Sequence, residues 1–257
     1  NRIDFNKLLN NEFGLFLKES NNNTVSSNGA LNSTYGINVQ RSSYNTFRDN
    51  NMTANKYNFG IAGNRLSHFI QDIDISNTVD GKPIYYWINQ KHKEVPADAG
   101  YVAVVNSTNI TVRDLNLTNN VQGVLFAFTD ESLIENVKIV NNTYGVYFYG
   151  SSDNTIVYNT VINNTYGVYF YGSSNNTVVD NTVTSKGKRG IQLINSSNNA
   201  ISNNMITNNY IGIGLWLSAE NNTISGNAIL NGTRGGVGLH LDLSLIHISE
   251  PTRQAEI

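Results

Sequence analysis

The chain has 257 residues, of which 39% are hydrophobic and 14% are charged, and its formal net charge is −2. This charge balance gives no electrostatic basis for binding nucleic acid, and the absence of cysteine excludes disulfides, thiolate metal sites and cysteine nucleophiles. No apolar stretch reaches the about 18 residues that a membrane-spanning helix needs.

A repeat is present from the first residues. Ile3 and Asn6 are followed 22 residues later by Val25 and Asn28, which have matching character. The sequence therefore starts inside an array of repeats. We expect a fragment without native end caps, cut from a longer multidomain chain, so the lack of a signal peptide carries no information on export.

The rhythm is interrupted at about residues 76–105, a segment that contains two of the three prolines. We expect irregular coils here, with a loop that leaves the body of the fold. His92 stands between two lysines in this loop, and we interpret it as part of a solvated basic segment. The expected strands are Ile70–Ile75, Ile84–Trp87 and Tyr101–Val105, and the expected loop is Asn89–Gly100.

The clearest repeat runs from Asn141 to Val183, where NNTYGVYFYGSSDNTIVYNTV is followed by INNTYGVYFYGSSNNTVVDNTV. After each repeat glycine, apolar residues alternate with others, as in Val146 and Phe148, which is typical of a strand with one buried face. A second strand follows at 156–161, and no helical period is present. The sequence therefore predicts an all-β, single-stranded parallel β-helix over residues 1–242, a solenoid of about 22 residues per coil. The repeat glycines are Gly123, Gly145, Gly167, Gly190, Gly212 and Gly236.

Asparagines recur in one column between the two buried positions of the second strand. A side-chain amide donates and accepts hydrogen bonds, and asparagine tolerates positive φ, so stacked copies can bridge coils and hold a tight bend. We interpret the column as an internal asparagine ladder; the alternative is that asparagine is merely abundant in a loop-rich surface protein. The ladder residues are Asn6, Asn28, Asn50, Asn159, Asn181, Asn204 and Asn227.

Four tyrosines occupy the outward phase of two neighbouring strands. Coils lie ~4.8 Å apart, so Tyr147, Tyr149, Tyr169 and Tyr171 would form an exposed patch, with Trp216 further along. A flat, hydroxyl-edged aromatic patch suits stacking against sugar rings. The alternative is that tyrosine serves here as an ordinary strand former. Among the outward-facing positions of the later strands, we expect His240 to stand in the same row along the solenoid axis as Trp216.

Carboxylates gather in one turn. Glu131 and Asp153 share a column, with Asp130 alongside, so two carboxylates on neighbouring coils could act as a glycosidase pair or hold a calcium ion. The column continues as Asn175 and Asn198, which favours a turn position that simply accepts Asp or Asn. We therefore expect no metal site and no cofactor.

Two further charge patterns stand out. Arg113 and Glu135 should stack one coil apart as a surface ion pair. A basic cluster replaces the usual NNTY turn, and a small site for an acidic sugar there competes with plain solvation. The cluster comprises Lys186, Lys188 and Arg189, with Arg234 two coils later.

The last fifteen residues differ in kind. Residues 243–257, LSLIHISEPTRQAEI, resemble the translation of a transposase sequencing adapter, and we interpret them as a library artefact rather than native sequence. His247, Glu250 and Glu256 are therefore given no functional role.

The phrases YGVYFYGSSDNTIVYNTV, HFIQDIDISNTVDGKPIYYW and GYVAVVNSTNITVRDLNLTNN resemble archaeal surface proteins of the NosD-like β-helix family, whose repeats are also grouped as carbohydrate-binding and sugar-hydrolase repeats. The resemblance covers nearly all of residues 1–242, and it implies a right-handed helix and an exported, cell-surface location. It also carries an association with copper delivery. The sequence does not support copper, because it has no cysteine and only two methionines, and its histidines do not cluster.

Three functions remain open. The first is a non-catalytic surface module that binds polysaccharide or a cell-envelope glycan. The second is a polysaccharide lyase, hydrolase or epimerase, which needs acid, base and cation-binding groups converging in one groove. The third is a structural spacer within a larger surface protein.

Overall fold

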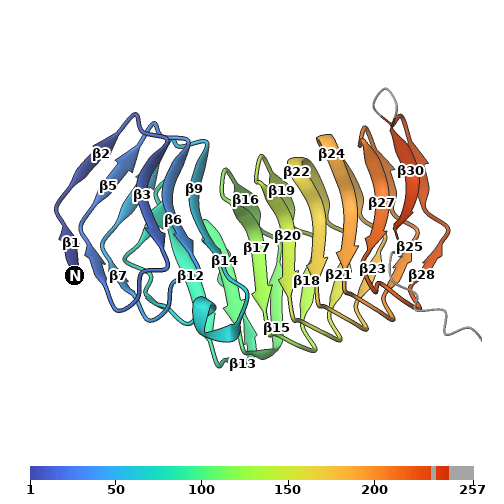
Figure 1. Ribbon diagram of the computed structural model, residues 1–257, viewed down its shortest axis with the longest axis horizontal. Coiled ribbons are helices and arrows are strands. Elements are labelled where there is room, and N and C mark those ends of the chain that lie inside the picture. Colours follow the sequence, from blue (N-terminus) through green and yellow to red (C-terminus); the bar gives the residue numbers. More distant parts are fainter. Residues whose placement is uncertain (233–235, 243–257) are drawn as a thin grey trace, which may run out of the picture.

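The structure, a computed structural model, describes residues 1–232 and 236–242. The backbone winds as a parallel β-solenoid of about 11 turns of about 22 residues each (Figure 1). The all-β class and the parallel β-helix are thus confirmed. Within the described ranges, the helical element is a single 3₁₀ turn, η1 (Leu66–Phe69), and no helix there is long and apolar enough to cross a membrane. The tail interpreted as an artefact, 243–257, lies outside the described residues.

Short strands from successive turns stack in register, for example Tyr144 against Tyr166 and Ile156 against Val178. Four sheets result. The four-stranded sheet contains β1 (Arg2–Asp4), β4 (Thr24–Ser26), β7 (Thr46–Arg48) and β10 (Asp72–Ile73). The three-stranded sheet contains β3 (Phe13–Lys18), β6 (Tyr35–Gln40) and β9 (Tyr57–Ala62). The seven-stranded sheet contains β13 (Lys91–Glu94), β15 (Thr108–Arg113), β18 (Leu133–Glu135), β21 (Thr155–Val157), β23 (Thr177–Val179), β25 (Ala200–Ser202) and β28 (Thr223–Ser225).

The 16-stranded sheet joins two faces of the solenoid, because its two longest strands, β22 (Thr160–Tyr171) and β24 (Thr182–Ile194), run through the corner between them. Its first path contains β2 (Lys7–Leu9), β5 (Gly29–Leu31), β8 (Asn51–Thr53), β11 (Thr78–Val79), β12 (Lys82–Ile88), β14 (Tyr101–Val105), β17 (Gln122–Ala127) and β20 (Tyr144–Tyr149). The rest of the sheet contains β16 (Asn116–Thr118), β19 (Lys138–Val140), β22 (Thr160–Tyr171), β24 (Thr182–Ile194), β26 (Met205–Thr207), β27 (Ile211–Trp216), β29 (Ala228–Leu230) and β30 (Val237–Asp242).

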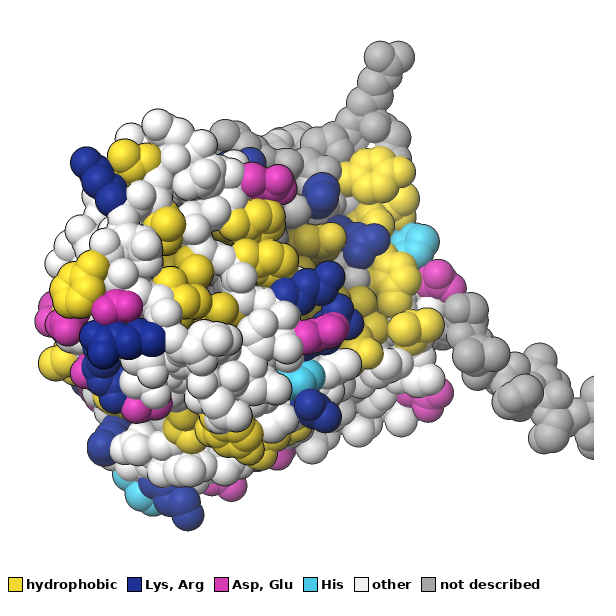
Figure 2. Space-filling model, turned by 60° about the vertical axis from the view of Figure 1, so that its left-hand side comes forward, with side chains coloured by type: hydrophobic (Ala, Val, Ile, Leu, Met, Phe, Trp, Pro, Cys, Tyr) yellow, Lys and Arg dark blue, Asp and Glu magenta, His cyan; other side chains and the backbone are white. Residues whose placement is uncertain are grey.

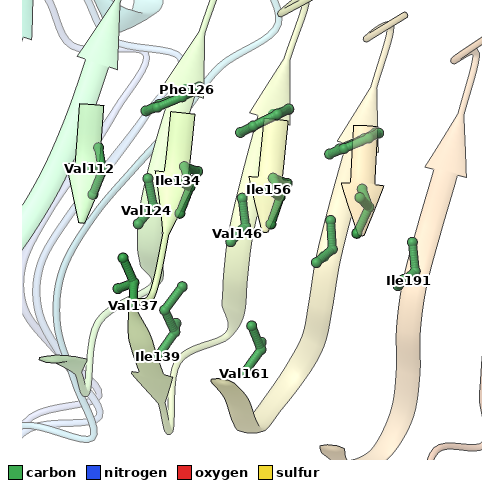
Figure 3. Close-up of a cluster of buried hydrophobic side chains, with 14 of the residues drawn as sticks. Val112, Val124, Phe126, Ile134, Val137, Ile139, Val146, Ile156, Val161 and Ile191 are labelled. Atoms are coloured by element: carbon green, nitrogen blue, oxygen red, sulfur yellow. The ribbon is translucent and has the colours of Figure 1, made fainter. Parts of the chain in front are cut away.

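The solenoid interior is a set of stacked apolar columns (Figure 3). Inward side chains pack on the equivalent residue of the next coil; Phe126 and Phe148 stack with ring centroids 5.1 Å apart, and Phe148 and Phe170 with centroids 4.9 Å apart. Each such fully buried side chain stabilises the fold by about 1.5–3 kcal/mol relative to exposure. This repeated burial explains why the period-2 pattern of the sequence identified the inward face.

The asparagine ladder is present. Asn159 Nδ2 donates to Asn181 Oδ1 over 3.0 Å, and Asn181 Nδ2 donates to Asn204 Oδ1 over 3.0 Å. The same pattern links Asn6 to Asn28 and Asn50, and Asn204 to Asn227. One detail of the prediction is wrong: none of the ladder residues has positive φ. The left-handed position is the residue just before, such as Tyr158 (φ 57°) or Asp180 (φ 56°).

Other corners carry similar ladders that the sequence reading missed. One joins Asn154, Asn176, Asn199 and Asn222 through side-chain amides. Another corner stacks serines, with Ser151 N donating to Ser173 Oγ over 3.0 Å. Each is visible in the sequence as a column with the coil period.

The stack shifts sideways in the irregular segment, which divides the early and later coils into the two bodies seen in Figure 1. The backbone of β9 bonds residues about 60 positions later: Asn58 N donates to Asn119 O, and Val121 N donates to Phe59 O. The core of the early coils therefore ends on the outer side of β14 and β17, where Phe59 packs edge-on against Tyr101 at 5.1 Å. One sheet thus separates two hydrophobic cores.

The expected loop at 89–100 is wrong. Lys91–Glu94 forms β13, which pairs with β15 at the start of the seven-stranded sheet, and the coil is shortened because Ile84 pairs with Tyr101. All four β13 residues are exposed, so no buried face signalled the strand. The expected strands at 84–87 and 101–105 lie within β12 and β14, whereas only Asp72–Ile73 of 70–75 is a strand.

Two local pairings also differ from expectation. Arg113 Nη2 forms its ion pair with Glu94 Oε2 at 2.7 Å, because β13 brings Glu94 beside it, and not with Glu135. At the last coil, Ile211 pairs with Val237 and Ile213 with Leu239. Gly238, rather than Gly236, therefore occupies the repeat position, and His240 pairs with Gly214 instead of sharing the row of Trp216.

Candidate glycan-binding face

The outer surface of β20, β22, β24, β27 and β30 carries the aromatic residues singled out in the sequence. Parallel pairing sets them in rows along the solenoid axis, so residues one coil apart are neighbours. In Figure 2, hydrophobic side chains and Lys or Arg side chains lie together on the surface of the later coils. The rows are Tyr144, Tyr166 and Arg189; Tyr147, Tyr169, Gln192, Gly214 and His240; and Tyr149, Tyr171, Ile194, Trp216 and Asp242.

The rings lie face to face along the axis. Tyr144 and Tyr166 stack with centroids 5.1 Å apart and planes 14° apart. The Arg189 guanidinium carbon lies 5.8 Å from the Tyr166 centroid and 4.4 Å from the Trp216 centroid, and Trp216 stacks on His240 at 5.2 Å. We call these five residues the ring stack. Its members cover one another's faces, and all five are partly exposed.

This geometry corrects the expectation of a flat stacking patch. Tyr149 and Tyr171 are also stacked, at 5.3 Å and 4°, while Tyr147 and Tyr169 meet edge to face at 5.3 Å. A sugar ring cannot lie on a face that the next coil already covers. The face instead offers the polar edges of its rings: phenol hydroxyls, an indole N–H, an imidazole and a guanidinium.

Exposure also differs from expectation. Tyr171 is 37% exposed, but Tyr147 is only 9% exposed, and Tyr149 and Tyr169 are half-buried. Tyr147 is buried because it belongs to the core cluster of the early coils, which end on this side of the sheet. Phe69 of η1 likewise packs 5.3 Å from Tyr149.

Burial keeps these phenols protonated. Desolvation raises the pKa of Tyr169 to about 12, with neighbouring Tyr166 and Tyr171 adding to the shift. Desolvation, followed by the nearby tyrosines, also raises the pKa values of Tyr144 and Tyr147. All three hydroxyls therefore remain neutral hydrogen-bond donors near neutral pH.

Sequence reasoning missed part of this face. The sequence predicts that Arg189 belongs to a basic turn cluster, but β24 places it in register with Tyr166, and its Nη1 donates to Gln192 Oε1 over 2.7 Å. Tyr144 and Tyr166, which directly precede the repeat glycines Gly145 and Gly167, were not among the predicted site residues. The sequence did hold a signal for this part of the face, because both tyrosines share a column of the repeat with Arg189. The side chain of Lys186 and all of Arg234 lie outside the described residues.

A cleft borders the face where the two bodies meet. Its volume is about 470 Å³, and it lies between Lys56 and Tyr57 of the early coils and a column of turn asparagines of the later coils. A second hollow of about 400 Å³ lies between η1 and the Tyr149–Tyr171 stack. Neither could be read from the sequence, because their walls come from coils that are distant in the chain. The asparagines of the first cleft are Asn119, Asn141 and Asn163.

The candidate carboxylates occupy turn positions. Glu131 (φ 53°) and Asp153 (φ 58°) adopt the left-handed conformation, as do Asn175 and Asn198 in the same column. The Asp130 carboxylate accepts a hydrogen bond from the Ser152 backbone N–H over 2.7 Å. All three acidic side chains are exposed, and no group of three or more potential metal ligands occurs among residues 1–232 and 236–242. Their arrangement matches turn formation.

Comparisons with solved structures found similar chains at low sequence identity. The Dettilon tailspike protein (gp208) is 16% identical, with a TM-score of 0.52, over 93% of this chain and 61% of its own. The Azotobacter vinelandii mannuronan C-5 epimerase AlgE6 A-module (13% identity, TM-score 0.45) is matched over 88% of this chain and 74% of its own. The Streptococcus pneumoniae surface adhesin PfbA (14%, 0.40) is matched over 84% and 61%. The chain thus spans about three fifths of the tailspike, and this likeness shows the fold alone.

The sequence model of one family, described as periplasmic copper-binding protein (NosD), matches residues 1–70 and 70–235. No curated protein matches the chain in sequence.

The described residues do not fit a copper site. Met52 is fully buried in the core of the early coils, whereas Met205 is 51% exposed on β26. Both ring nitrogens of His68 lie against N–H donors, Nε2 accepting from Arg65 Nε over 2.9 Å. His92 lies within β13 at an irregular position with φ 52°, and His240 stacks on Trp216. No soft-ligand cluster forms in this part of the chain, so we derive no copper chemistry for it.

Proposed function

The chain belongs to the NosD family, and from this membership and the geometry of its outer face we propose that it is an extracytoplasmic β-helix module that binds an extended polysaccharide. The family description is periplasmic, which supports a location outside the cytoplasm. Binding rather than catalysis is favoured because the three candidate carboxylates, Asp130, Glu131 and Asp153, are exposed and lie at turns rather than in a groove.

The observation that carries the proposal is the ring stack, whose five members are partly exposed and follow one another along the solenoid axis. Coils repeat every ~4.8 Å, so hydrogen-bonding groups recur along the axis at short, regular intervals. A polysaccharide lying parallel to the axis would meet one member of the ring stack at each coil. Tyr166, Arg189 and Trp216 would contact successive parts of the chain through their hydroxyl, guanidinium and indole N–H groups.

Pre-ordering favours such binding. The rings are held by their neighbours at 4.4–5.8 Å, and Gln192, which is 2% exposed, fixes the guanidinium through its Oε1. Little side-chain freedom is then lost when a ligand binds. Two of the structural matches are a tailspike protein and a surface adhesin. Both names agree with a surface-binding role for this fold.

The test is a polysaccharide panel measured by affinity electrophoresis and Trp fluorescence, scored also for release of reducing or unsaturated ends. Tyr166→Phe keeps the ring stacking but removes the edge hydroxyl, so we expect about threefold to tenfold weaker binding, the worth of one hydrogen bond. Tyr158→Phe is the matched control, because Tyr158 is 60% exposed in a turn outside the five strands of this face.

Binding that Tyr166→Phe weakens and Tyr158→Phe does not supports the proposal. If both variants bind the polysaccharide as tightly as the wild-type protein does, the site lies elsewhere. Release of product would show an enzyme, and no binding to any member of the panel would leave a structural spacer.

A further inference from the structure

Arg189 is set apart from the other described arginines. Four of these, Arg2, Arg41, Arg48 and Arg113, form ion pairs with carboxylates, and Arg65 donates to His68. Arg189 forms no ion pair with a described residue, although its side chain is half-buried. Among the described residues, its guanidinium contacts the π faces of Tyr166 and Trp216 and one amide oxygen.

The guanidinium retains free donors. It has five N–H groups, and the one hydrogen bond that its side chain donates to a described residue is Nη1 to Gln192 Oε1. The planar fork of the remaining N–H groups matches the two oxygens of a carboxylate. The aromatic contacts fix the plane of this fork between two coils, so that it cannot turn towards a distant acidic residue.

The groups around Arg189 reinforce this preference. The face offers phenol hydroxyls, an indole N–H and an imidazole, and most of these donate hydrogen bonds. Lys188, the neighbour of Arg189 in the chain, is exposed and adds a second positive charge. The charged group at the other end of the ring stack is Asp242, which lies next to Trp216 in the row of β27 and β30. A ligand rich in acceptors and negative charge fits the centre of this row best.

Resting on the proposed function, we propose that the bound polysaccharide is acidic and carries carboxylates, as a polyuronate does, and that Arg189 receives one sugar carboxylate in a bidentate contact. The adjacent ring edges then bind the hydroxyls and ring oxygens of the flanking sugars. A neutral chain can occupy the same row but leaves the Arg189 charge uncompensated.

The experiment compares matched forms of the same polymers: polygalacturonate and alginate as carboxylates, and the same two polymers after methyl esterification. Dextran and dextran sulfate form a third pair that separates carboxylate recognition from general anion binding. The variants are Arg189→Gln, Arg189→Lys and, as the exposed neighbouring control, Lys188→Gln. Far-UV circular dichroism and thermal melting confirm that each variant is folded.

We expect the wild-type protein to bind at least one carboxylate form about tenfold or more tightly than its ester. Arg189→Gln should abolish this difference, because it weakens binding of the carboxylate form more than binding of the ester, and Arg189→Lys should keep part of it. Lys188→Gln should change it less than threefold. Raising NaCl from about 50 to 200 mM should weaken binding of the carboxylate form, because exposed charges are screened.

Equal binding of acid and ester forms overturns this proposal and leaves polysaccharide binding in place. A preference for acid that Arg189→Gln does not reduce overturns the role of Arg189. Equal or tighter binding of dextran sulfate overturns the assignment to carboxylates. If the proteins bind no polymer in any pair or in the wider panel, the proposed function itself fails.

Discussion

Removing one amide from the asparagine ladder should destabilise the solenoid strongly. Asn181 Oδ1 accepts from Asn159 N and Asn159 Nδ2, over 2.9 and 3.0 Å. Its Nδ2 donates to Ile156 O and Val179 O, both over 2.9 Å, and to Asn204 Oδ1 over 3.0 Å. Asn181 is 1% exposed, so water cannot replace these bonds in the Asn181→Ala variant.

The magnitude follows from the bonds lost. A buried hydrogen bond contributes about 1 kcal/mol net, and a stranded buried donor costs about 1–3 kcal/mol. Asn181→Ala loses both amide N–H groups and the carbonyl that serves Asn159, and it leaves the Asn159 backbone N–H without its partner. We therefore expect the free energy of unfolding to fall by about 3–4 kcal/mol.

The assay is urea denaturation followed by far-UV circular dichroism, with Asn116→Ala as the control. Asn116 is an exposed strand asparagine whose side chain makes no hydrogen bond to a described residue, so its removal should cost less than about 0.5 kcal/mol. Because a solenoid can unfold coil by coil, amide hydrogen exchange at Asn159 should report the loss locally. A difference below about 1 kcal/mol between the two variants would refute the energetic role of the ladder.

Three further predictions follow from particular contacts. In Gly167→Ala the new methyl group would overlap the Gly190 carbonyl oxygen and Val183, so we expect the free energy of unfolding to fall by about 3 kcal/mol. In the control Gly29→Ala the methyl group meets only Leu31 at an ordinary contact distance, so this variant should melt like the wild type. Tyrosine pKa values raised by burial, such as that of Tyr169 at about 12 against 10.0 unfolded, leave stability unchanged below pH 10. The unfolded chain releases its phenol protons first, so stability should fall as pH rises from 10 towards 12, and Tyr169→Phe should fall less steeply in an alkaline titration of the melting temperature. Asp153→Asn should change stability by less than about 0.5 kcal/mol, because asparagine also suits its φ of 58°; a shift beyond about 1 kcal/mol would mean that the carboxylate makes a specific interaction.

The candidate site was only partly visible in the sequence. The outward phase of the four tyrosines could be predicted because side chains alternate along a strand. Their burial could not be predicted, since Tyr147 packs against the core of the early coils, which lie far from it in the sequence. Nor could the ring planes be predicted: strand periodicity fixes the direction of a side chain, while packing between coils fixes its rotation, as for Tyr149 and Tyr171 at 4°.

The sequence by itself determined the solenoid. Each coil contacts mainly its neighbours, so a column such as Ile134, Ile156 and Val178 records the tertiary contacts directly in its period. The sideways shift between the two bodies leaves no periodic pattern in the sequence, because it brings β9 into contact with residues about 60 positions later. Tertiary structure alone decided that junction and the hidden side of the aromatic face, since these depend on contacts between coils that are far apart in the sequence and share no period.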